Sequence, residues 1–334
     1  MTDLSIRKTG RAGRITFTRP KALNALSHPM AQAIHRALDD WREDADVDLV
    51  IIDAEGERAF CAGGDIAAVY HAGKAGDHSV GADFFRDEYR MNAAIADYPK
   101  PIVAFMQGFV MGGGVGVGGH AGHRIVGDTT RIAMPESGIG LIPDVGGTWL
   151  LARAPGRIGE YLALTGARMG PGDAIHARFA DSYLPEDLWP DLIAELERTG
   201  DATLIRGQTP PDAPLATRDL SAFGGHDLEQ IRARLEAQGD ADSLKALDRN
   251  SPLSMAAGLE MVRAARADDR MQQSLSREFR FTARATRQGD FLEGVRAQII
   301  DKDRQPDWQA AATPEAVAAM LAPLDDELEW EETA

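Results

Sequence analysis

The sequence predicts a mixed α/β core over residues 1–200 and a helical region over 201–334 that ends in an acidic tail. Three observations predict this division. Strand-like apolar segments alternate with helical segments as far as Ala133, strands then largely stop, and helical patterns continue to about Ile300. With 334 residues, of which 44% are apolar, the chain is long enough to bury a large core.

Before residue 82 the patterns predict a β-hairpin, a helix, a buried strand and a short helix. The hairpin pairs residues 5–8 with 15–18, and the first helix spans 27–41. The buried strand spans 47–53, and the short helix spans 65–70. Gly10–Gly13 supplies the hairpin turn, and Ser27 is a helix-capping residue with Pro29 in the first turn. The segment 71–79 contains glycines and few large apolar residues, so it predicts a flexible connection.

The next helix, over residues 82–97, places a carboxylate on an apolar face. Phe84, Glu88, Met91 and Ile95 follow the four-three-four spacing of one helical face. Glu88 therefore belongs to the buried stripe. Such a carboxylate can be satisfied by an arginine, or it can serve a site.

The remaining patterns predict three strands and then a series of helices. The strands span 101–107, 124–126 and 131–133. The helices span 148–153, 157–164, 188–197, 228–237, 252–265, 271–287 and 291–300. The proline-rich segment 200–223 predicts a long surface linker.

Composition excludes several classes of function. The formal charge of −16 argues against broad nucleic-acid binding, although a few local arginines could still bind a phosphate-bearing small molecule. There is no run of about 18 apolar residues, so we expect no membrane span. Cys61 is the only cysteine, which excludes an intrachain disulfide, and we expect it to be a packing residue. A cytoplasmic location and no bound metal are expected.

Two carboxylates stand in a segment that is otherwise apolar or glycine. Glu136 and Asp144 lie eight residues apart, and burying unpaired acidic groups is costly. Upstream, the clusters Gly63–Gly64 and Gly112–Gly114 can bring backbone N–H groups close to a ligand. Carboxylates facing backbone donors suit acyl chemistry. As alternatives, Asp144 could cap the following helix, and Glu136 could accept N–H bonds from its own loop.

A dinucleotide-binding interpretation of the second glycine cluster is disfavoured. The segment Gly114–Gly119 matches G-x-G-x-x-G, but this motif requires an acidic residue about 20 positions later. Asp128 comes only 14 residues after Gly114, and the glycine-rich segment between them is a poor crossover helix.

Taken together, these motifs resemble the enoyl-CoA hydratase/isomerase (crotonase) superfamily. The segment Arg19–Leu26 resembles its first CoA-contacting loop, Ala59–Ile66 its first oxyanion loop, and Gly112–Gly116 its second. The resemblance implies a crotonase-like spiral of ββα units, followed here by the helical C-terminal region. It also implies an acyl-CoA substrate, bound in part by Lys21 and Ala22, and no separate cofactor.

Within the superfamily, the sequence is similar to the 3-hydroxyisobutyryl-CoA hydrolases. The similar segments are Phe84–Asn92, Met111–Gly116, Ala133–Glu136, Ile142–Gly147 and Glu293–Asp303. Hydratases hold water with two glutamates, one of them just after the glycine cluster. Here that position is Gly116, so the resemblance implies hydrolysis of a short 3-hydroxyacyl-CoA instead of hydration.

The resemblance also implies a role for each site residue. Gly64 and Gly113 would hold the thioester oxygen through their N–H groups, and Glu136 would attack the carbonyl or activate water. Asp144 and Glu88 would orient Glu136, the water and the substrate hydroxyl. An enoyl-CoA isomerase and a non-catalytic acyl-CoA-binding protein are the alternatives. Crotonase relatives often form trimers, which leaves a trimer-based homo-oligomer open.

Overall fold

The computed structural model describes residues 3–330, which form two compact units assembled from interleaved segments. The first unit contains the residues up to Asp65, Asp87–Ala133 and Arg168–Arg218. The second contains Ile66–Arg86, Met134–Ala167 and the residues from Asp219 onward. The predicted division of the chain at residue 200 stays a prediction.

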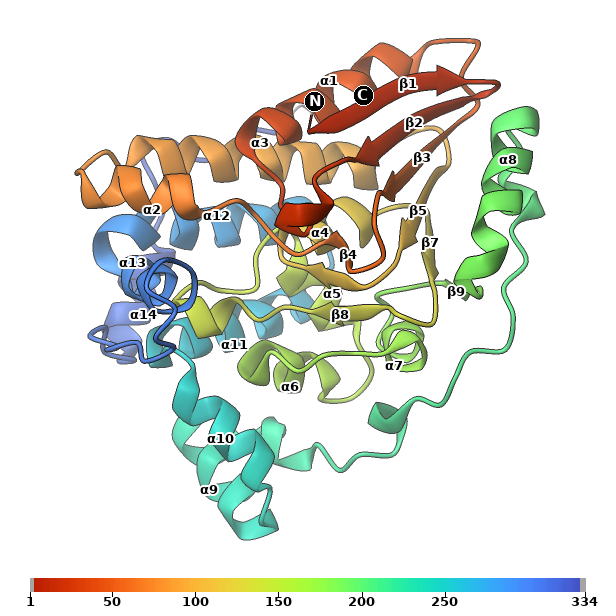
Figure 1. Ribbon diagram of the computed structural model, residues 1–334. Helices are drawn as coiled ribbons and strands as arrows, with labels where there is room; N and C mark the ends of the chain where they lie inside the picture. Colours follow the sequence, from red (N-terminus) through yellow and green to blue (C-terminus); the bar gives the residue numbers. More distant parts are fainter. Residues whose placement is uncertain (1–2, 331–334) are drawn as a thin grey trace. The chain divides into compact units, whose positions relative to one another are not determined.

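The first unit is built on a sheet with the strand order β1-β2-β3-β5-β7-β9 (Figure 1). Its strands are β1 (Leu4–Thr9), β2 (Ala12–Phe17), β3 (Leu49–Ala54), β5 (Ile102–Met106), β7 (His123–Val126) and β9 (Ser182–Tyr183). β1 and β2 pair antiparallel around a tight turn, and the later pairs are parallel. The predicted hairpin and the predicted strands of this sheet are confirmed.

A smaller parallel sheet is interleaved with the first in chain order. Its strands are β4 (Ala59–Cys61), β6 (Phe109–Met111) and β8 (Arg131–Ala133). The chain passes from β3 to β4, from β5 to β6 and from β7 to β8, so consecutive strands alternate between the sheets. Helices connect these strand pairs. This repetition is the spiral of ββα units that the family resemblance implies, although β4, β6 and β9 were not predicted as separate strands.

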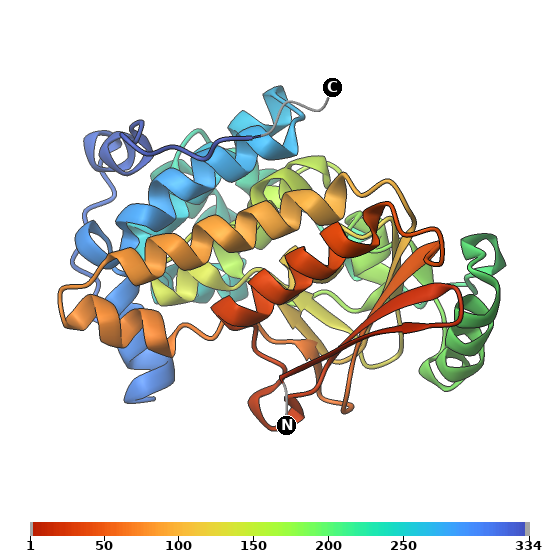
Figure 2. The same cartoon turned by 90° about the horizontal axis from the view of Figure 1, so that it is seen from above.

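Helices cover both faces of the larger sheet. Ala12 of β2 belongs to a buried core shared with Trp189 and Ile193 of α8 (Trp189–Thr199). The next residue, Gly13, lies against the ring of Trp41 in α1 (His28–Arg42). Because successive strand residues point to opposite faces, α1 and α8 cover opposite faces of the sheet. Figure 2 shows them on either side of the strands.

The helix α3 (Ser79–Ala96) is divided between the two units, and its part from Asp87 onward, in the first unit, lies alongside α1 (Figures 1 and 2). The Asp87 carboxylate fixes this pair, because its Oδ2 accepts hydrogen bonds from Nε2 of His28 and Nε2 of Gln32, both at 2.7 Å. Two shorter helices, α4 (Gly113–Gly118) and α7 (Pro171–His176), complete the helices of this unit. Neither α4 nor α7 was among the predicted helices.

The second unit is helical. Its helices are α2 (Ala67–Lys74), α5 (Gly147–Arg153), α6 (Ile158–Thr165), α9 (Leu228–Gln238), α10 (Ala241–Arg249), α11 (Pro252–Ala267), α12 (Met271–Gln288), α13 (Phe291–Val295) and α14 (Pro314–Leu321). A π-helical turn, Arg296–Ile300, follows α13. The predicted helices from residue 148 onward are confirmed, whereas α10 and α14 were missed.

Two connections bear on the sequence predictions. The expected flexible connection over 71–79 is wrong for most of its length, because α2 extends to Lys74 and α3 begins at Ser79. The predicted linker over 200–223 is irregular and contains 3-10 turns over 202–204, 214–216 and 221–224. Among residues 3–330, none of the helices combines the length and the apolarity needed to cross a membrane.

Candidate active site

Three of the predicted site residues converge in the first unit, although they come from distant parts of the sequence. A Cβ atom built on Gly113 would lie 2.6 Å from Oε1 of Glu88 and 3.5 Å from the backbone nitrogen of Gly64. The Glu88 carboxylate and two glycine loops therefore meet at one place. The nearest apolar neighbour of that point is Leu26, whose Cδ2 lies 3.3 Å away.

The backbone around Gly64 pairs with Leu26, and this pairing leaves the N–H of Gly64 pointing away from Leu26. Leu26 donates its N–H to the carbonyl of Gly63 at 2.9 Å, and Asp65 donates to the carbonyl of Leu26 at 2.8 Å. The N–H of Gly64 lies between these two bonds and is not used by either. Gly113 begins α4, where a backbone N–H has no partner inside the helix. Both amides are thus available to a bound acceptor.

The two glycine loops pack against each other with no room for side chains. A Cβ on Gly114 would lie 2.1 Å from the carbonyl oxygen of Cys61. Gly112 also has a φ of 47°, a conformation that favours glycine. These glycines are therefore required by the close approach of the loops, which the sequence alone could not distinguish from ordinary tight turns.

Glu88 lies on the buried face of α3, as its spacing predicts, and is only 2% exposed. Phe84, Met91 and Ile95 of the same stripe are also buried. The neighbouring Asp87 ties α3 to α1 and so fixes the rotation of the helix that carries Glu88. The sequence predicted that this carboxylate is buried. It could not predict that the carboxylate lies against the backbone of Gly113.

Lys21 and Ala22, the predicted CoA-contacting residues, are exposed on the 3-10 turn Pro20–Ala22. The buried side chain of Asn24 holds the adjoining loop by donating to the carbonyls of Glu55 and Ala59 and accepting from the N–H of Arg19. Asn24 itself has a φ of 55°, which asparagine tolerates better than most residues. Its positioning role was not predicted.

Cys61 is fully buried, and its Sγ donates to the carbonyl of Gly63. Burial raises the pKa of this thiol to about 12. A thiol with so high a pKa supplies almost no thiolate at neutral pH, and the thiolate is the reactive form. The prediction that Cys61 is a packing residue is confirmed.

Glu136 belongs to the second unit, where it begins the 3-10 turn Glu136–Ile139. Ser137, the next residue in this turn, makes two hydrogen bonds to other elements. Its hydroxyl donates to the carbonyl of Ala163 in α6 at 3.1 Å. The carbonyl of Ser137 accepts the N–H of Ser251 at the start of α11 at 2.9 Å. Glu136 is 5% exposed. The turn that carries it is thus fixed by helices of the second unit.

Asp144 is also buried in the second unit, but it is not the N-cap of α5. Gly146 occupies that position with a φ of 77°, and Val145 before it has a φ of 56°. The N–H groups of Gly146 and Thr148 are accepted by Glu278 of α12, at 2.7 and 3.0 Å. The capping explanation of Asp144 is therefore wrong, because a carboxylate from another helix caps α5.

Glu278 was missed by the sequence analysis. It is completely buried in the structure, and burial raises its pKa to about 8. Hydrogen bonds from Thr148 and Gly146 oppose this rise, whereas the negative charge of Asp144 adds to it. The Thr148 hydroxyl also bonds to Oε1, and a hydroxyl can donate to the ionised carboxylate or accept from the protonated acid. Glu278 therefore shapes both the loop and the electrostatics around Asp144.

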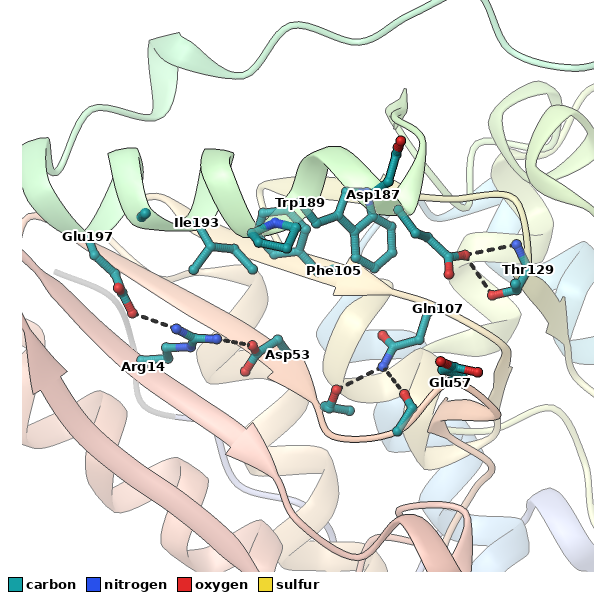
Figure 3. A pocket seen from close by; sticks show the side chains of 15 residues that line it. Arg14, Asp53, Glu57, Phe105, Gln107, Thr129, Asp187, Trp189, Ile193 and Glu197 are labelled. Atoms are coloured by element: carbon teal, nitrogen blue, oxygen red, sulfur yellow. Dashed lines mark hydrogen bonds and ion pairs between the residues drawn. The ribbon is translucent and has the colours of Figure 1, made fainter.

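A separate cavity of about 730 Å³ lies beside α8 in the first unit and contains none of the predicted site residues (Figure 3). We call it the acidic cleft. Arg14 on its wall is paired with Asp53 at 2.5 Å and with Glu197 at 2.7 Å. The Trp189 ring packs against Phe105 at 5.3 Å. Its excess of carboxylates makes the acidic cleft a poor site for the phosphates of CoA.

Metal coordination finds no support in the described part of the chain. Between residues 3 and 330, His, Cys, Asp and Glu side chains do not form a group of three or more that could hold a metal ion.

The family model for enoyl-CoA hydratase/isomerase matches residues 12–324. The chain belongs to the enoyl-CoA hydratase/isomerase family. The match includes the glycine loops and Glu88 of the first unit, together with Glu136, Asp144 and Glu278 of the second.

Relatives of this family member carry different activity names. A Gallus gallus protein named 3-hydroxyisobutyryl-CoA hydrolase, mitochondrial, is 39% identical, with 94% of this chain and 86% of that protein covered. A Rhodobacter sphaeroides crystal structure named as an enoyl-CoA hydratase is 55% identical, has a TM-score of 0.95 and covers 98% of this chain and 100% of its own. A Mycobacterium thermoresistibile structure named as a carnitinyl-CoA dehydratase is 40% identical, with a TM-score of 0.93 and coverage of 99% and 100%.

These similarities confirm the predicted family and its α/β fold. They extend across the helical C-terminal region, since nearly the whole chain is covered. The predicted site residues are divided between the two units. Gly64, Gly113 and Glu88 are brought together in the first, whereas Glu136 and Asp144 belong to the second.

The glycine at 113 is predicted to be essential for activity in this family member. In Gly113→Ala the new methyl group would collide with Glu88 Oε1, and relieving the collision must move the loop or the carboxylate. We expect kcat to fall at least about tenfold, given that losing one well-placed backbone donor costs roughly 10²–10³ in kcat.

Gly122→Ala is the matched control, because a Cβ there meets only Ile102 backbone atoms at 3.8 and 4.0 Å. Steady-state rates of both variants on an acyl-CoA substrate give the comparison. Equal rates in the two variants would show that the contact between Gly113 and Glu88 is unimportant.

The buried Glu278 is predicted to make stability depend on pH. Its pKa is higher in the folded chain, about 8, than the ordinary value of 4.5. Between those pH values the folded state binds more protons, so the free energy of unfolding falls as pH rises through that window. A pKa difference of one corresponds to about 1.4 kcal/mol.

Glu278→Gln cannot titrate, so its unfolding free energy should fall less than that of the wild type over the same window. Denaturant unfolding at several pH values measures this, with Glu236→Gln, an exposed change on α9, as the control. If the unfolding free energy of Glu278→Gln depends on pH as strongly as that of the wild type, Glu278 is not the source of the pH dependence.

Proposed function

We propose that this protein hydrolyses the thioester of a short 3-hydroxyacyl-CoA, with 3-hydroxyisobutyryl-CoA as the main substrate and 3-hydroxyisobutyrate and CoA as products. The observation that carries the proposal is the meeting of the buried Glu88 with the backbone of Gly64 and Gly113. The hydrolase name of relatives at 34–40% identity over at least 90% of this chain supports the same activity.

The two glycine amides are proposed to form an oxyanion hole. When a nucleophile attacks a thioester carbonyl, negative charge develops on the carbonyl oxygen. Two preorganised N–H donors stabilise that charge, and each is typically worth a few kcal/mol in the transition state. Gly64 and Gly113 supply donors that the surrounding backbone does not use, so they require no rearrangement before the reaction.

Glu136 is proposed to be the reacting carboxylate. In one route its oxygen attacks the carbonyl carbon, the C–S bond breaks, CoA leaves as the thiol after gaining a proton, and water then hydrolyses the mixed anhydride. In the other route Glu136 takes a proton from water, and the resulting hydroxide attacks directly. Either route needs a carboxylate held rigidly, and Ser137 fixes the turn that carries Glu136.

Glu88 and Asp144 are proposed to orient the reactants. Glu88 lies within contact distance of the Gly113 backbone, so it can accept a hydrogen bond from a hydroxyl on an acyl group bound there. A buried polar group favours a substrate that satisfies it and discriminates against one that leaves it unpaired. A 3-hydroxyacyl group fits this requirement better than a plain acyl group. Asp144, fixed through Glu278, would orient Glu136 and the water.

A hydratase is the second candidate, because the Rhodobacter sphaeroides structure is named as one. Gly116 disfavours it: this residue lies inside α4, and glycine has no side chain to hold a water or transfer a proton. An enoyl-CoA isomerase needs only one carboxylate and remains an alternative.

Participation in valine catabolism and a cytoplasmic location stay predictions, and so does a trimer-based assembly. The Gallus gallus relative is named mitochondrial.

The hydrolase proposal predicts which product forms. With 3-hydroxyisobutyryl-CoA we expect steady release of free thiol, which a thiol reagent detects. With 2-enoyl-CoA or 3-enoyl-CoA we expect hydration or double-bond migration to be at least about 100-fold slower, since general acid–base catalysis typically contributes 10²–10⁴-fold. Rapid hydration or migration without thiol release would contradict the hydrolase proposal.

The role of Glu136 predicts a specific loss. Glu136→Gln keeps the size of the side chain but removes the nucleophile and base, so we expect kcat to fall by about 10²–10⁴-fold or more. Binding of the CoA ester, measured by calorimetry, should change little. Retained hydrolysis would rule out Glu136 as the reacting group, whereas lost binding would indicate a structural role instead.

A further inference from the structure

A second cavity, of about 530 Å³, lies in the second unit and is lined by several arginines. We call it the arginine cavity. Arg157 precedes α6, Arg234 lies on α9, and Arg263 and Arg266 lie on α11. One acidic side chain, Glu160, lines it with them. The chain as a whole has a net charge of −16, so this local excess of positive charge runs against its composition.

Glu160 neutralises only part of this charge. It is completely buried and lies 2.7 Å from Nη1 of Arg157. Both of its oxygens also pair with the Arg266 guanidinium at 3.2 Å. A buried carboxylate needs such partners, so these two arginines have a structural role. Two further arginines remain without an acidic partner in the cavity.

Arg263 is oriented by backbone groups instead of by a carboxylate. Its Nη1 and Nη2 donate to the carbonyls of His226 and Gly225 at 2.5 Å. Burial lowers the pKa of this guanidinium, and the positive charges of Arg157 and Arg266 lower it further, against the opposing effect of Glu160. Burial is the main cause, so a charged guanidinium is held here with little contact to water, and a bound anion would supply a charged partner.

Arg234 is exposed, and within residues 3–330 it has no ion pair or side-chain hydrogen bond. It lies four residues after Gln230 on α9, so both side chains point to the same side of the helix. Arg263 and Arg266 on α11 are three residues apart, a spacing that also places two side chains on the same side of a helix. Helical spacing thus directs arginines from two elements toward one cavity.

We propose that the arginine cavity binds a small molecule carrying a phosphate group. Guanidinium groups present a planar fork of donors that matches phosphate oxygens, and charge-assisted bonds of this kind are about twice as strong as neutral ones. The volume falls within the roughly 300–1,000 Å³ typical of small-ligand pockets, which exceeds what a bare ion needs. The acidic cleft, which has the opposite charge, would exclude the same ligand.

The proposal concerns binding and does not rest on the hydrolase activity. The probes are inorganic phosphate, ribose 5-phosphate and ribose, each titrated into the full-length protein by calorimetry at constant ionic strength set with chloride. We expect both phosphates to bind and ribose not to. Tighter binding of ribose 5-phosphate would identify an organic phosphate as the ligand, and equal binding would identify free phosphate. Failure of both phosphates to bind would overturn the proposal.

Two glutamine substitutions on α9 test the location. Arg234→Gln should weaken phosphate binding at least about tenfold, since hydrogen bonds to charged groups contribute roughly 1.5–3 kcal/mol. Arg232→Gln is the matched control, because it removes the same charge from the same helix outside the arginine cavity, where Arg232 pairs with Asp248 at 2.7 Å. Its affinity should stay within about twofold of wild type.

Arg263→Lys provides an independent variant. It keeps the positive charge but loses the fork, so we expect weaker phosphate binding. Because lysine cannot replace both bonds to the carbonyls of His226 and Gly225, thermal unfolding is measured alongside to confirm that the variant is folded at the temperature of the titration. If Arg234→Gln and Arg232→Gln weaken binding equally, the effect is general electrostatics and the proposed site is wrong. Unchanged binding in both Arg234→Gln and Arg263→Lys would overturn it as well.

Discussion

The cost of burying carboxylates is the constraint on which the candidate site depends. Glu88, Glu136, Asp144 and Glu278 are each at most 5% exposed. An isolated charge in such surroundings is very unfavourable, so each acid must be hydrogen-bonded, paired or protonated. Glu278 illustrates the compromise: it accepts bonds from the Gly146 and Thr148 backbone, yet burial still raises its pKa to about 8. The fold therefore sets the positions of all four carboxylates, and for Glu278 it also shifts the pKa.

The same constraint explains why the glycines are where they are. Backbone amides can face a buried carboxylate or a substrate oxygen only if no Cβ intervenes. At Gly113 a Cβ would lie 2.6 Å from Glu88, and at Gly114 it would lie 2.1 Å from the carbonyl of Cys61. Two parallel strands, β4 and β6, deliver these loops side by side. The interleaved sheets therefore place the amides, and glycine permits the approach.

Periodicity predicted the α/β core, the helices that follow it and the burial of Glu88, because these follow from local spacing along the chain, whereas the spiral of ββα units was implied by the family resemblance. The contact between Glu88 and Gly113 could not be predicted, since it depends on how α3 packs against the end of β6. Glu278 could not be found for a similar reason. It lies 130 residues from Thr148 and looks like any glutamate in an amphipathic helix. The helix-capping explanation of Asp144 was locally sound and failed because a distant side chain took that role.

The helical C-terminal region has a direct part in holding the carboxylates of the second unit. The N–H of Ser251 donates to the carbonyl of Ser137, next to Glu136. A Cβ on Gly140, at the end of the same turn, would lie 2.4 Å from the Asp290 carbonyl carbon, so the turn also packs tightly against the residues before α13. Glu278 of α12 holds the loop of Asp144. Residues beyond 219 thus fix both loops that carry the buried carboxylates, so this region is part of the structure that positions Glu136 and Asp144.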